Sequence, residues 1–291
     1  MSTAPNTSQT YVVQSYKRQL TERFRKAGIV AAQEEALDLL MAVTGFSLTD
    51  IALRGKDELS EVAMMSLSRL AARRLGGEPL DMILGWREFY GRKFKVTKDV
   101  LSPRGDSETL ILSCLSALEG KTSPSILDLG TGSGALALTL LAERPDAQAL
   151  AVDLSDAALS VAKENAKALK VVDRCELIQS DWFENVTGQF DLIVSNPPYI
   201  TNAAMEALET EVLNYDPDLA LRGGEDGLEA YRKILSDYRP FLKIGGALWV
   251  EIGYDQGASI SELFKQNGVV APRVVKDLAG HDRCVGGEYQ I

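Results

Sequence analysis

The sequence predicts an α/β protein in which a mostly parallel sheet has helices on both faces. A small all-helical domain precedes the sheet, and a β-hairpin joins the two. Apolar residues recur at helical spacings of three and four through residues 11–77, whereas short apolar runs typical of strands alternate with helical segments beyond residue 125. A glycine-rich turn after the first of those strands is a third indication, because open parallel sheets bind ligands at such turns.

The helical region is predicted to hold four helices. Val13, Tyr16, Leu20 and Phe24 share one face of the first helix. Short polar residues cap helix N-termini and glycines end helices, so these residue types mark the expected boundaries. The expected caps are Thr49 or Asp50 for the third helix and Ser60 for the fourth, and the expected ends are Gly28, Gly45, Gly55 and Gly76.

The chain is expected to divide into four parts. Residues 1–10 are polar and small, and are predicted to be disordered. Residues 11–77 carry no catalytic motif, which favours recognition or scaffolding, and they are interpreted as a substrate-recognition domain. Residues 78–105 are interpreted as a hairpin and linker, with strands in 83–91 and 94–96 and a turn-rich stretch that can wall a cleft. Residues 106–291 form the α/β domain.

Strands and helices alternate through the α/β domain. Parallel strands are buried on both faces and therefore read as continuous apolar runs. The predicted helices are the segment after the glycine turn through Leu141, Ser155 to about Leu169, Tyr231–Leu242 and Ser259–Asn267. The predicted strands are Ile126–Leu129, Ala149–Asp153, Glu176–Ile178, Asp191–Ser195 and Gly246–Ile252, with a final pair near Arg273–Lys276 and Tyr289.

Composition excludes several classes of protein. The 31 Lys and Arg residues against 41 Asp and Glu give a net charge of −10, which disfavours general nucleic-acid binding. The three cysteines have no C-x-x-C spacing, which excludes a disulfide framework and a cysteine zinc site, and His281 is the only histidine, so no metal site is expected. The N-terminus lacks signal-peptide features and no apolar run spans a bilayer, so a cytoplasmic protein without membrane contact is expected.

A glycine turn and a downstream acid predict a nucleoside-containing cofactor. Gly130, Gly132 and Gly134 follow the first strand and open a helix, where glycine allows positive φ or close approach of a ligand. Asp153 ends the next strand, about 20 residues on, where a carboxylate can accept hydrogen bonds from ribose hydroxyls. These two features leave a nicotinamide cofactor and S-adenosylmethionine both open.

The tetrapeptide Asn196-Pro197-Pro198-Tyr199 separates them, because it follows the strand Asp191–Ser195 at the rim where a cofactor lies. Two prolines fix φ twice and make the loop stiff. The Asn196 side-chain oxygen and the Pro197 carbonyl can each accept one N–H of a planar NH₂ group, and Tyr199 can stack on its flat face. Such positioning supports in-line attack of a weakly nucleophilic amide or aromatic amine nitrogen on a sulfonium methyl.

The glycine turn, Asp153 and Asn196–Tyr199 together resemble the amino-methyltransferases, which use S-adenosylmethionine on planar nitrogens. From residue 11 onward the chain is similar to the HemK/PrmC family of glutamine methyltransferases, which have a Rossmann-like class I methyltransferase sheet. The segments that carry this closer resemblance are Ile83–Phe89, Leu101–Glu108, Glu211–Pro217, Ala220–Leu228 and Glu251–Gln256.

The resemblance implies a role for each motif residue. The glycine turn would line the methionine end of the cofactor, one acid would hold the ribose, and the residues after the third strand would meet the adenine. The loop would hold the substrate amide, with Asn196 also near the cofactor, and two further residues would border the cleft. The glycine turn is Gly130, Thr131, Gly132, Ser133 and Gly134, and the ribose acid is Asp153. The residues that would meet the adenine are Asp181 and Trp182. The loop is Asn196, Pro197, Pro198 and Tyr199, and the two cleft residues are Phe89 and Arg104.

The implied activity is N5-methylation of the glutamine in the Gly-Gly-Gln loop of class I peptide chain release factors, by a monomer that binds no nucleic acid stably. Three alternatives stay open: a glutamine methyltransferase acting on a ribosomal protein, a DNA adenine-N6 methyltransferase, and a cofactor-binding module without catalysis. The chain departs from the family at Gly105, where a proline is usual, which would loosen that turn. Ser107 stands where the family has threonine and is expected to keep its capping hydroxyl.

Overall fold

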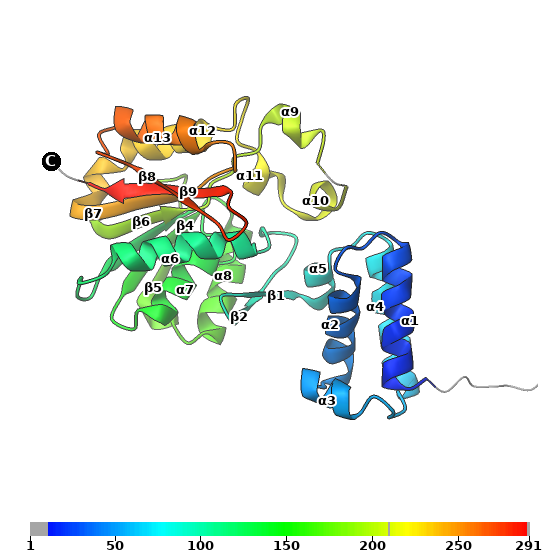
Figure 1. Cartoon of the computed structure of the whole chain (residues 1–291). Helices are drawn as coiled ribbons and strands as arrows, with labels where there is room; N and C mark the ends of the chain where they lie inside the picture. Colours follow the sequence, from blue (N-terminus) through cyan, green and yellow to red (C-terminus); the bar gives the residue numbers. More distant parts are fainter. Residues whose placement is uncertain (1–10, 209, 290–291) are drawn as a thin grey trace, which may run out of the picture. The chain divides into compact units, whose positions relative to one another are not determined.

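The computed structural model describes residues 11–208 and 210–289 (Figure 1). The predicted disorder of residues 1–10 therefore lies outside the described residues. The described chain forms two compact units, divided between Leu84 and Gly85.

The first unit is all helical. Its core contains Leu20, Phe24, Leu39, Leu40 and Leu67, which are fully buried on three of the helices. The apolar stripe of the first helix predicted part of this core, because residues at spacings of three and four share one helix face. The helices are α1 (Val13–Lys26), α2 (Ala32–Thr44), α3 (Leu48–Leu53), α4 (Glu61–Leu75) and α5 (Leu80–Leu84).

Helix capping agrees with the sequence at one helix and differs at another. Ser60 caps α4, and its Oγ accepts a hydrogen bond from the Ala63 N–H at 3.2 Å. The predicted caps of α3 are wrong, because Ser47 is its N-cap. Asp50 instead completes a capping box in which its Oδ2 accepts the Ser47 N–H at 2.9 Å.

The hairpin is present but begins later than predicted. Its strands β1 (Trp86–Phe89) and β2 (Arg92–Lys95) pair antiparallel. Ile83 and the residue after it are helical rather than extended, because the Ile83 N–H donates to the Pro79 carbonyl at 3.0 Å and closes a turn of α5. Gly85, at a φ of +76°, ends that turn, which only a residue tolerant of positive φ does without strain.

The second unit contains the predicted sheet. Within the described residues it has seven strands in the order β5-β4-β3-β6-β7-β9-β8, of which the first five are parallel and β9 runs antiparallel to both of its neighbours. The strand order reverses between β3 and β6, which is where such sheets bind ligands. The strands are β3 (Ser125–Leu129), β4 (Gln148–Asp153), β5 (Cys175–Gln179), β6 (Phe190–Ser195), β7 (Leu242–Glu251), β8 (Arg273–Lys276) and β9 (Asp282–Glu288).

Helices cover both faces of the sheet, as Figure 1 shows. Leu110 of α6 and Leu138 of α7 pack in the core of one face, and Tyr231 of α12 and Phe264 of α13 pack in the core of the other. Helix α6 was not predicted. The helical segments of this unit are α6 (Glu108–Ala117), α7 (Ala135–Glu143), α8 (Asp156–Ala168), α9 (Asn202–Met205), α10 (Thr210–Tyr215), α11 (Asp218–Leu221), α12 (Glu229–Asp237) and α13 (Gly257–Gln266), with 3-10 turns η1 (Gly105–Ser107), η2 (Val172–Arg174) and η3 (Arg239–Phe241).

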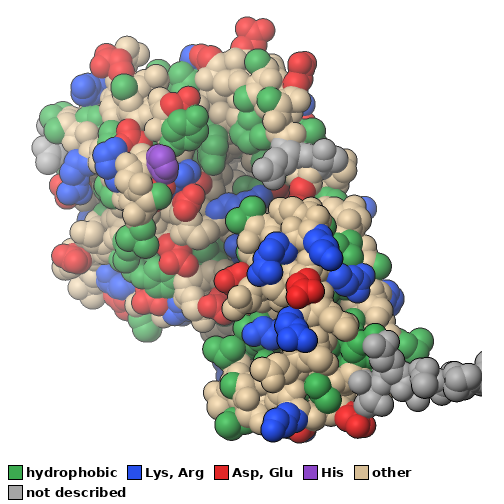
Figure 2. All heavy atoms as spheres, turned by 45° about the vertical axis from the view of Figure 1, so that its right-hand side comes forward, with side chains coloured by type: hydrophobic (Ala, Val, Ile, Leu, Met, Phe, Trp, Pro, Cys, Tyr) green, Lys and Arg blue, Asp and Glu red, His purple; other side chains and the backbone are tan. Residues whose placement is uncertain are grey.

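Charge is divided unequally between the two units. Residues 1–84 hold ten Lys and Arg against ten Asp and Glu, so the whole net charge of −10 falls on residues 85–291. Helix α1 exposes Arg18, Arg23 and Arg25, and Figure 2 shows several Lys and Arg side chains on the visible face of the helical unit. Among the described residues, no helix combines the length and hydrophobicity that crossing a bilayer requires.

Candidate functional site

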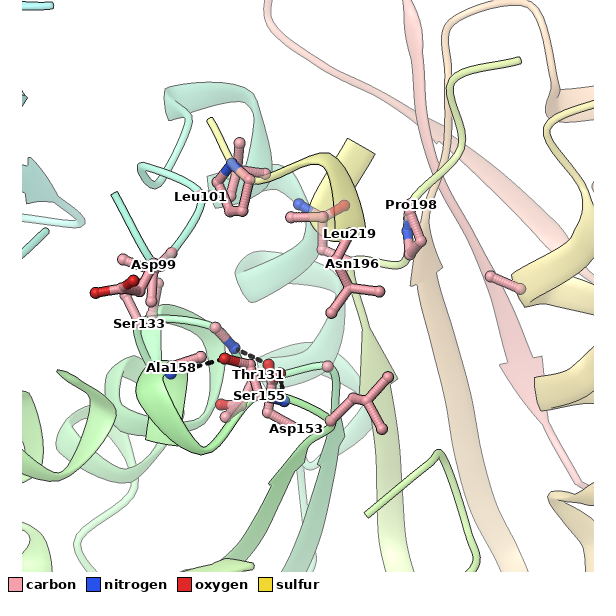
Figure 3. Close-up of a pocket in the computed structure, with 18 of the residues that line it drawn as sticks. Asp99, Leu101, Thr131, Ser133, Asp153, Ser155, Ala158, Asn196, Pro198 and Leu219 are labelled. Carbon is pink, nitrogen blue, oxygen red and sulfur yellow. Dashed lines mark hydrogen bonds between the residues drawn. The ribbon is translucent and has the colours of Figure 1, made fainter. Parts of the chain in front are cut away.

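A cavity of about 570 Å³ lies in the second unit at the carboxyl ends of the parallel strands. Its volume falls in the range of small-molecule sites. Residues that follow β3, β4, β5 and β6 line it, together with the segments 98–104 and 217–222. Figure 3 shows Thr131, Asp153 and Ser155 on one side of the cavity, with Asn196 and Pro198 across from them.

The structure brings eleven of the fourteen predicted site residues to this cavity. The three that do not line it are Gly134, Pro197 and Tyr199. Those that do are Phe89, Arg104, Gly130, Thr131, Gly132, Ser133, Asp153, Asp181, Trp182, Asn196 and Pro198.

The three glycines of the turn after β3 all have positive φ, at 71° for Gly130, 56° for Gly132 and 83° for Gly134. They differ in how much space surrounds them. A Cβ at Gly130 or Gly132 would meet no atom within 4 Å, so these two border open space. A Cβ at Gly134 would lie 2.7 Å from Cδ1 of Leu138, which leaves no room for it. The first two glycines therefore leave room for a ligand, and the third is required by packing.

Asp153, at the end of β4, holds the backbone at two residues that line the cavity, Gly132 and Ser155. Its Oδ2 accepts the Gly132 N–H at 2.8 Å and its Oδ1 accepts the Ser155 N–H at 2.9 Å (Figure 3). Burial raises the pKa of the Asp153 carboxyl, while these two hydrogen bonds lower it. Each carboxylate oxygen keeps a further lone pair, so the group can still accept hydroxyl donors from the cavity.

Asp128, in the strand before the glycine turn, is a polar residue to which the sequence analysis gave no role. It is completely buried, and its Oδ2 accepts hydrogen bonds from Oγ1 of Thr131 at 2.6 Å and from the Ala137 N–H at 3.2 Å. Burial raises the pKa of its carboxyl to about 7. Asp128 thus ties the start of the turn to the first turn of α7.

The turn after β5 presents an aromatic ring to the cavity. Trp182 lines the cavity and has a φ of +47°, which is unusual for a bulky residue. Ser180 is buried beside it and holds this conformation, because its Oγ donates to the Trp182 carbonyl at 2.9 Å and accepts the Asn185 N–H at 3.0 Å. Ser180 directly precedes the predicted pair Asp181 and Trp182 and was not itself predicted as a site residue.

The loop Asn196–Tyr199 packs against one other segment, residues 221–223. The Ile200 N–H donates to the Leu221 carbonyl at 2.9 Å, and the Gly223 N–H donates to the Ile200 carbonyl at 2.8 Å. A Cβ at Gly223 would lie 2.7 Å from the Tyr199 Cα, so the two backbones touch. Burial raises the pKa of the Tyr199 phenol to about 12, with the charge of Glu251 as a further cause. The loop is therefore rigid before any substrate arrives.

Phe89 and Arg104 line the cavity from the segments before the sheet. Phe89 is buried and packs edge-to-face on Phe94, with ring centroids 6.0 Å apart. Arg104 is half exposed, and its Nη2 lies 2.8 Å from Oδ2 of Asp216 in an ion pair.

Comparison with known proteins identifies the family. Residues 16–85 match the family described as PrmC N-terminal domain, and residues 104–225 match the Methyltransferase small domain. The release factor glutamine methyltransferase of Agrobacterium fabrum is 42% identical over 91% of this chain and 93% of its own, and that of Cereibacter sphaeroides is 43% identical over 92% and 95%. The chain belongs to the release factor glutamine methyltransferase family.

More distant relatives agree with the fold. The bifunctional methyltransferase of Rickettsia felis is 37% identical over 94% of this chain, which spans 58% of the length of that protein. The crystal structure of the hMettl16 catalytic domain in complex with an RNA hairpin has a TM-score of 0.58 at 15% identity and covers 79% of this chain and 82% of its own. A methyltransferase from Pyrococcus furiosus has a TM-score of 0.50 at 18% identity, over 77% and 100%. The predicted Rossmann-like methyltransferase fold is confirmed.

As a member of this family the chain is a methyltransferase that uses S-adenosylmethionine. The cavity fits that cofactor. Gly130 and Gly132 leave open space, Asp153 offers a carboxylate for ribose hydroxyls, and Trp182 offers a flat apolar surface for a purine.

The expected capping role of Ser107 is wrong. No side chain caps α6, because Ser107 is helical in backbone conformation; its buried side chain instead lowers the pKa of the Glu251 carboxyl. Gly105, the departure from the usual family proline, does not have positive φ, and a Cβ there would meet no atom within 4 Å. The site therefore has no steric need for glycine at position 105.

Proposed function

We propose that this protein transfers the methyl group of S-adenosylmethionine to the side-chain amide nitrogen of the glutamine in the Gly-Gly-Gln loop of class I peptide chain release factors. The observation that carries the proposal is the rigid Asn196–Tyr199 loop at the rim of the cofactor cavity. The curated relatives at 42% and 43% identity over most of their length bear the name of this activity.

The loop provides the acceptors that a glutamine side chain needs. The Asn196 side-chain oxygen accepts one N–H of the substrate amide and the Pro197 carbonyl accepts the other, so the nitrogen is held and its electron density is raised. When bound, S-adenosylmethionine would supply an electrophilic methyl group, and its sulfur would keep the electron pair of the broken S–C bond and leave as a neutral thioether. As the new N–C bond forms, the amide nitrogen gains positive charge, and it loses that charge when one of its protons leaves to water. Positioning of this kind can supply several kcal/mol of the barrier.

The remaining residues act on the two ligands separately. Gly130, Thr131, Gly132, Ser133 and Gly134 would surround the methionine end of the cofactor, Asp153 would hold the ribose, and Asp181 and Trp182 would hold the adenine. Phe89 and Arg104 would border the entry for the substrate loop, and Tyr199, which does not itself line the cavity, would support the amide-binding loop. Residues 11–77 would recognise the remainder of the release factor, with 78–105 as the connection to the methyltransferase domain 106–291.

We place this activity in the cytoplasm, in a monomer that makes no stable contact with nucleic acid or membrane. Two observations support this. The net charge of −10 repels phosphate backbones. Cys114, Cys175 and Cys284 are all buried free thiols, which suits a reducing compartment.

Labelled S-adenosylmethionine tests the substrate. The protein is incubated with a class I release factor, with ribosomal proteins or with duplex DNA, and the label is then located by proteolysis and mass spectrometry. Label on the Gly-Gly-Gln glutamine is the expected result. Label on DNA alone, or on a ribosomal protein alone, would overturn the assignment.

A variant tests the role of the loop. Asn196→Ala should abolish transfer while the affinity for the cofactor, measured by calorimetry, stays within a few-fold of wild type. Asn267→Ala is the matched control, because Asn267 follows α13 and does not line the cavity; its activity should equal wild type. Normal turnover by Asn196→Ala would show that this side chain does not hold the amide.

A further inference from the structure

A buried acid lies directly beside the substrate loop. Glu251 is the last residue of β7 and only 2% of its surface is exposed. Strands β6 and β7 are parallel neighbours, and Ser195 pairs with Val250. Asn196 directly follows β6 and Glu251 ends β7, so the register places these two residues side by side at the rim of the sheet.

The Glu251 carboxyl lies beside the substrate loop, and one of its oxygens is unpaired. The side chains of Ser107 and Asn196 each lower the pKa of this carboxyl, as nearby hydrogen-bond donors do. Its Oε2 has no hydrogen-bond partner among the described residues. Burying a carboxylate with an unpaired oxygen costs several kcal/mol. Packing therefore gives no reason for an acid at this position.

A hydrogen bond between the Asn196 and Glu251 side chains can have only one direction. An ionised carboxylate can only accept hydrogen bonds, so Asn196 must present its Nδ2 to Glu251. The bond lowers the pKa of Glu251, as a donor to the charged form does. The opposite atom of the carboxamide, Oδ1, is then left for the cavity that Asn196 lines. Without this partner the Asn196 carboxamide could flip and present its own NH₂ to the substrate NH₂ group, which can only donate.

We propose that Glu251 is a positioning residue, which holds the Asn196 carboxamide with Oδ1 toward the substrate amide. This inference rests on the proposed function, because it assigns a task to Asn196 in that reaction. The negative charge of Glu251 would also favour the positive charge that the amide nitrogen gains during transfer.

Several charged and titratable groups face Glu251. Arg283 of β9 lowers the pKa of its carboxyl and Asp106 of η1 raises it, while burial is the largest cause of a shift to about 7. Arg283 is itself held by Asp277 at 3.0 Å and Asp106 at 3.2 Å. The remaining neighbours are Tyr199 of the loop, Tyr231 of α12 and Cys284 of β9, whose pKa values are all raised in part by Glu251.

Because the ionised form of Glu251 is the one that orients Asn196, methyl transfer should increase as pH rises through about 7. Glu251→Gln cannot ionise and nearly preserves the shape of the side chain. Its kcat at pH 8 should fall at least tenfold, its affinity for S-adenosylmethionine should stay within about threefold, and the step in kcat near pH 7 should be absent. Glu176→Gln is the matched control, because Glu176 is exposed on β5; it should keep the wild-type profile.

Ser107→Ala tests the same proposal without changing Glu251, so the proposal stays testable even if Glu251→Gln does not fold. Ser107→Ala removes a hydrogen bond that lowers the pKa of Glu251. The midpoint of the pH profile should therefore move to higher pH, which loss of packing alone would not cause. An unmoved midpoint in Ser107→Ala, or a Glu251→Gln enzyme with wild-type kcat and pH profile, would refute the positioning role. If the wild-type enzyme itself transfers no methyl group to a release factor, the proposed function fails instead.

Discussion

Asp128 gives a pH dependence of stability that can be worked out from its environment. The carboxyl is completely buried and has a pKa of about 7, whereas an unfolded chain gives about 3.9. Its pKa is raised on folding, so the folded state holds the proton more tightly than the unfolded state. Stability is then greatest at low pH and decreases as pH rises from about 4 to about 7. From pH 5 to pH 8 this one group should remove ~2.5 kcal/mol from the free energy of unfolding.

Asp128→Asn removes the titration but can keep the hydrogen bonds, because the amide oxygen can accept from both Thr131 and Ala137. The free energy of unfolding of the variant minus that of wild type should therefore increase by ~2.5 kcal/mol between pH 5 and pH 8. Glu251 titrates in both proteins, so its contribution cancels in the difference.

Urea denaturation followed by tryptophan fluorescence measures this difference. Trp86, Trp182 and Trp249 all lie in the unit 85–291, so the signal reports on that unit and not on the helical unit. If the two proteins respond to pH in parallel, with a constant gap between their stabilities, Asp128 is already ionised at pH 5 and the argument from burial is incorrect.

Two further predictions concern the cavity. Asp153→Asn replaces one acceptor oxygen with an NH₂ group that faces the N–H of Gly132 or Ser155. The loss of one charged hydrogen bond should raise the Kd for S-adenosylmethionine ~10–100-fold, as measured by calorimetry. A change below threefold would contradict the role of this carboxylate. Gly223→Ala places a Cβ against Tyr199 and should shift the loop, which reduces kcat ~100-fold with cofactor affinity retained. Wild-type kcat in Gly223→Ala would mean that the loop tolerates displacement.

The sheet was predictable because its central strands are buried on both faces and so appear as continuous apolar runs. Helix α6 was missed for a related reason, because its sequence Glu108–Ala117 is apolar on most sides, with Leu112 exposed, and shows little helical periodicity. Ile83 is apolar and buried and was predicted as extended, although it lies within the short helix α5. Burial alone does not separate a short buried helix from a strand, and only the hydrogen bonds of the folded chain decide between them.

Motif residues that follow a strand could be placed from the sequence, since parallel strands bring their carboxyl ends to one edge. Gly130, Asp153 and Asn196 are of this kind, and all three line the cavity. Residues that act through a neighbour could not be placed. Ser107 and Glu251 are 144 positions apart in the chain, and only the docking of η1 over the end of β7 brings them together. Nothing local in either segment indicates the other.

The hydrogen bonds of Asp153 have a consequence for the catalytic cycle. Because this carboxylate already ties Gly132 and Ser155 in the free protein, the cofactor enters a cradle whose backbone needs little further ordering, at a saving of ~1–2 kcal/mol for each residue that would otherwise be fixed on binding. The demethylated cofactor product has the same ribose and base, so it binds to the same preordered backbone. Turnover should therefore depend on removal of this product from the cell, since little but the lost sulfonium charge distinguishes it from a fresh donor.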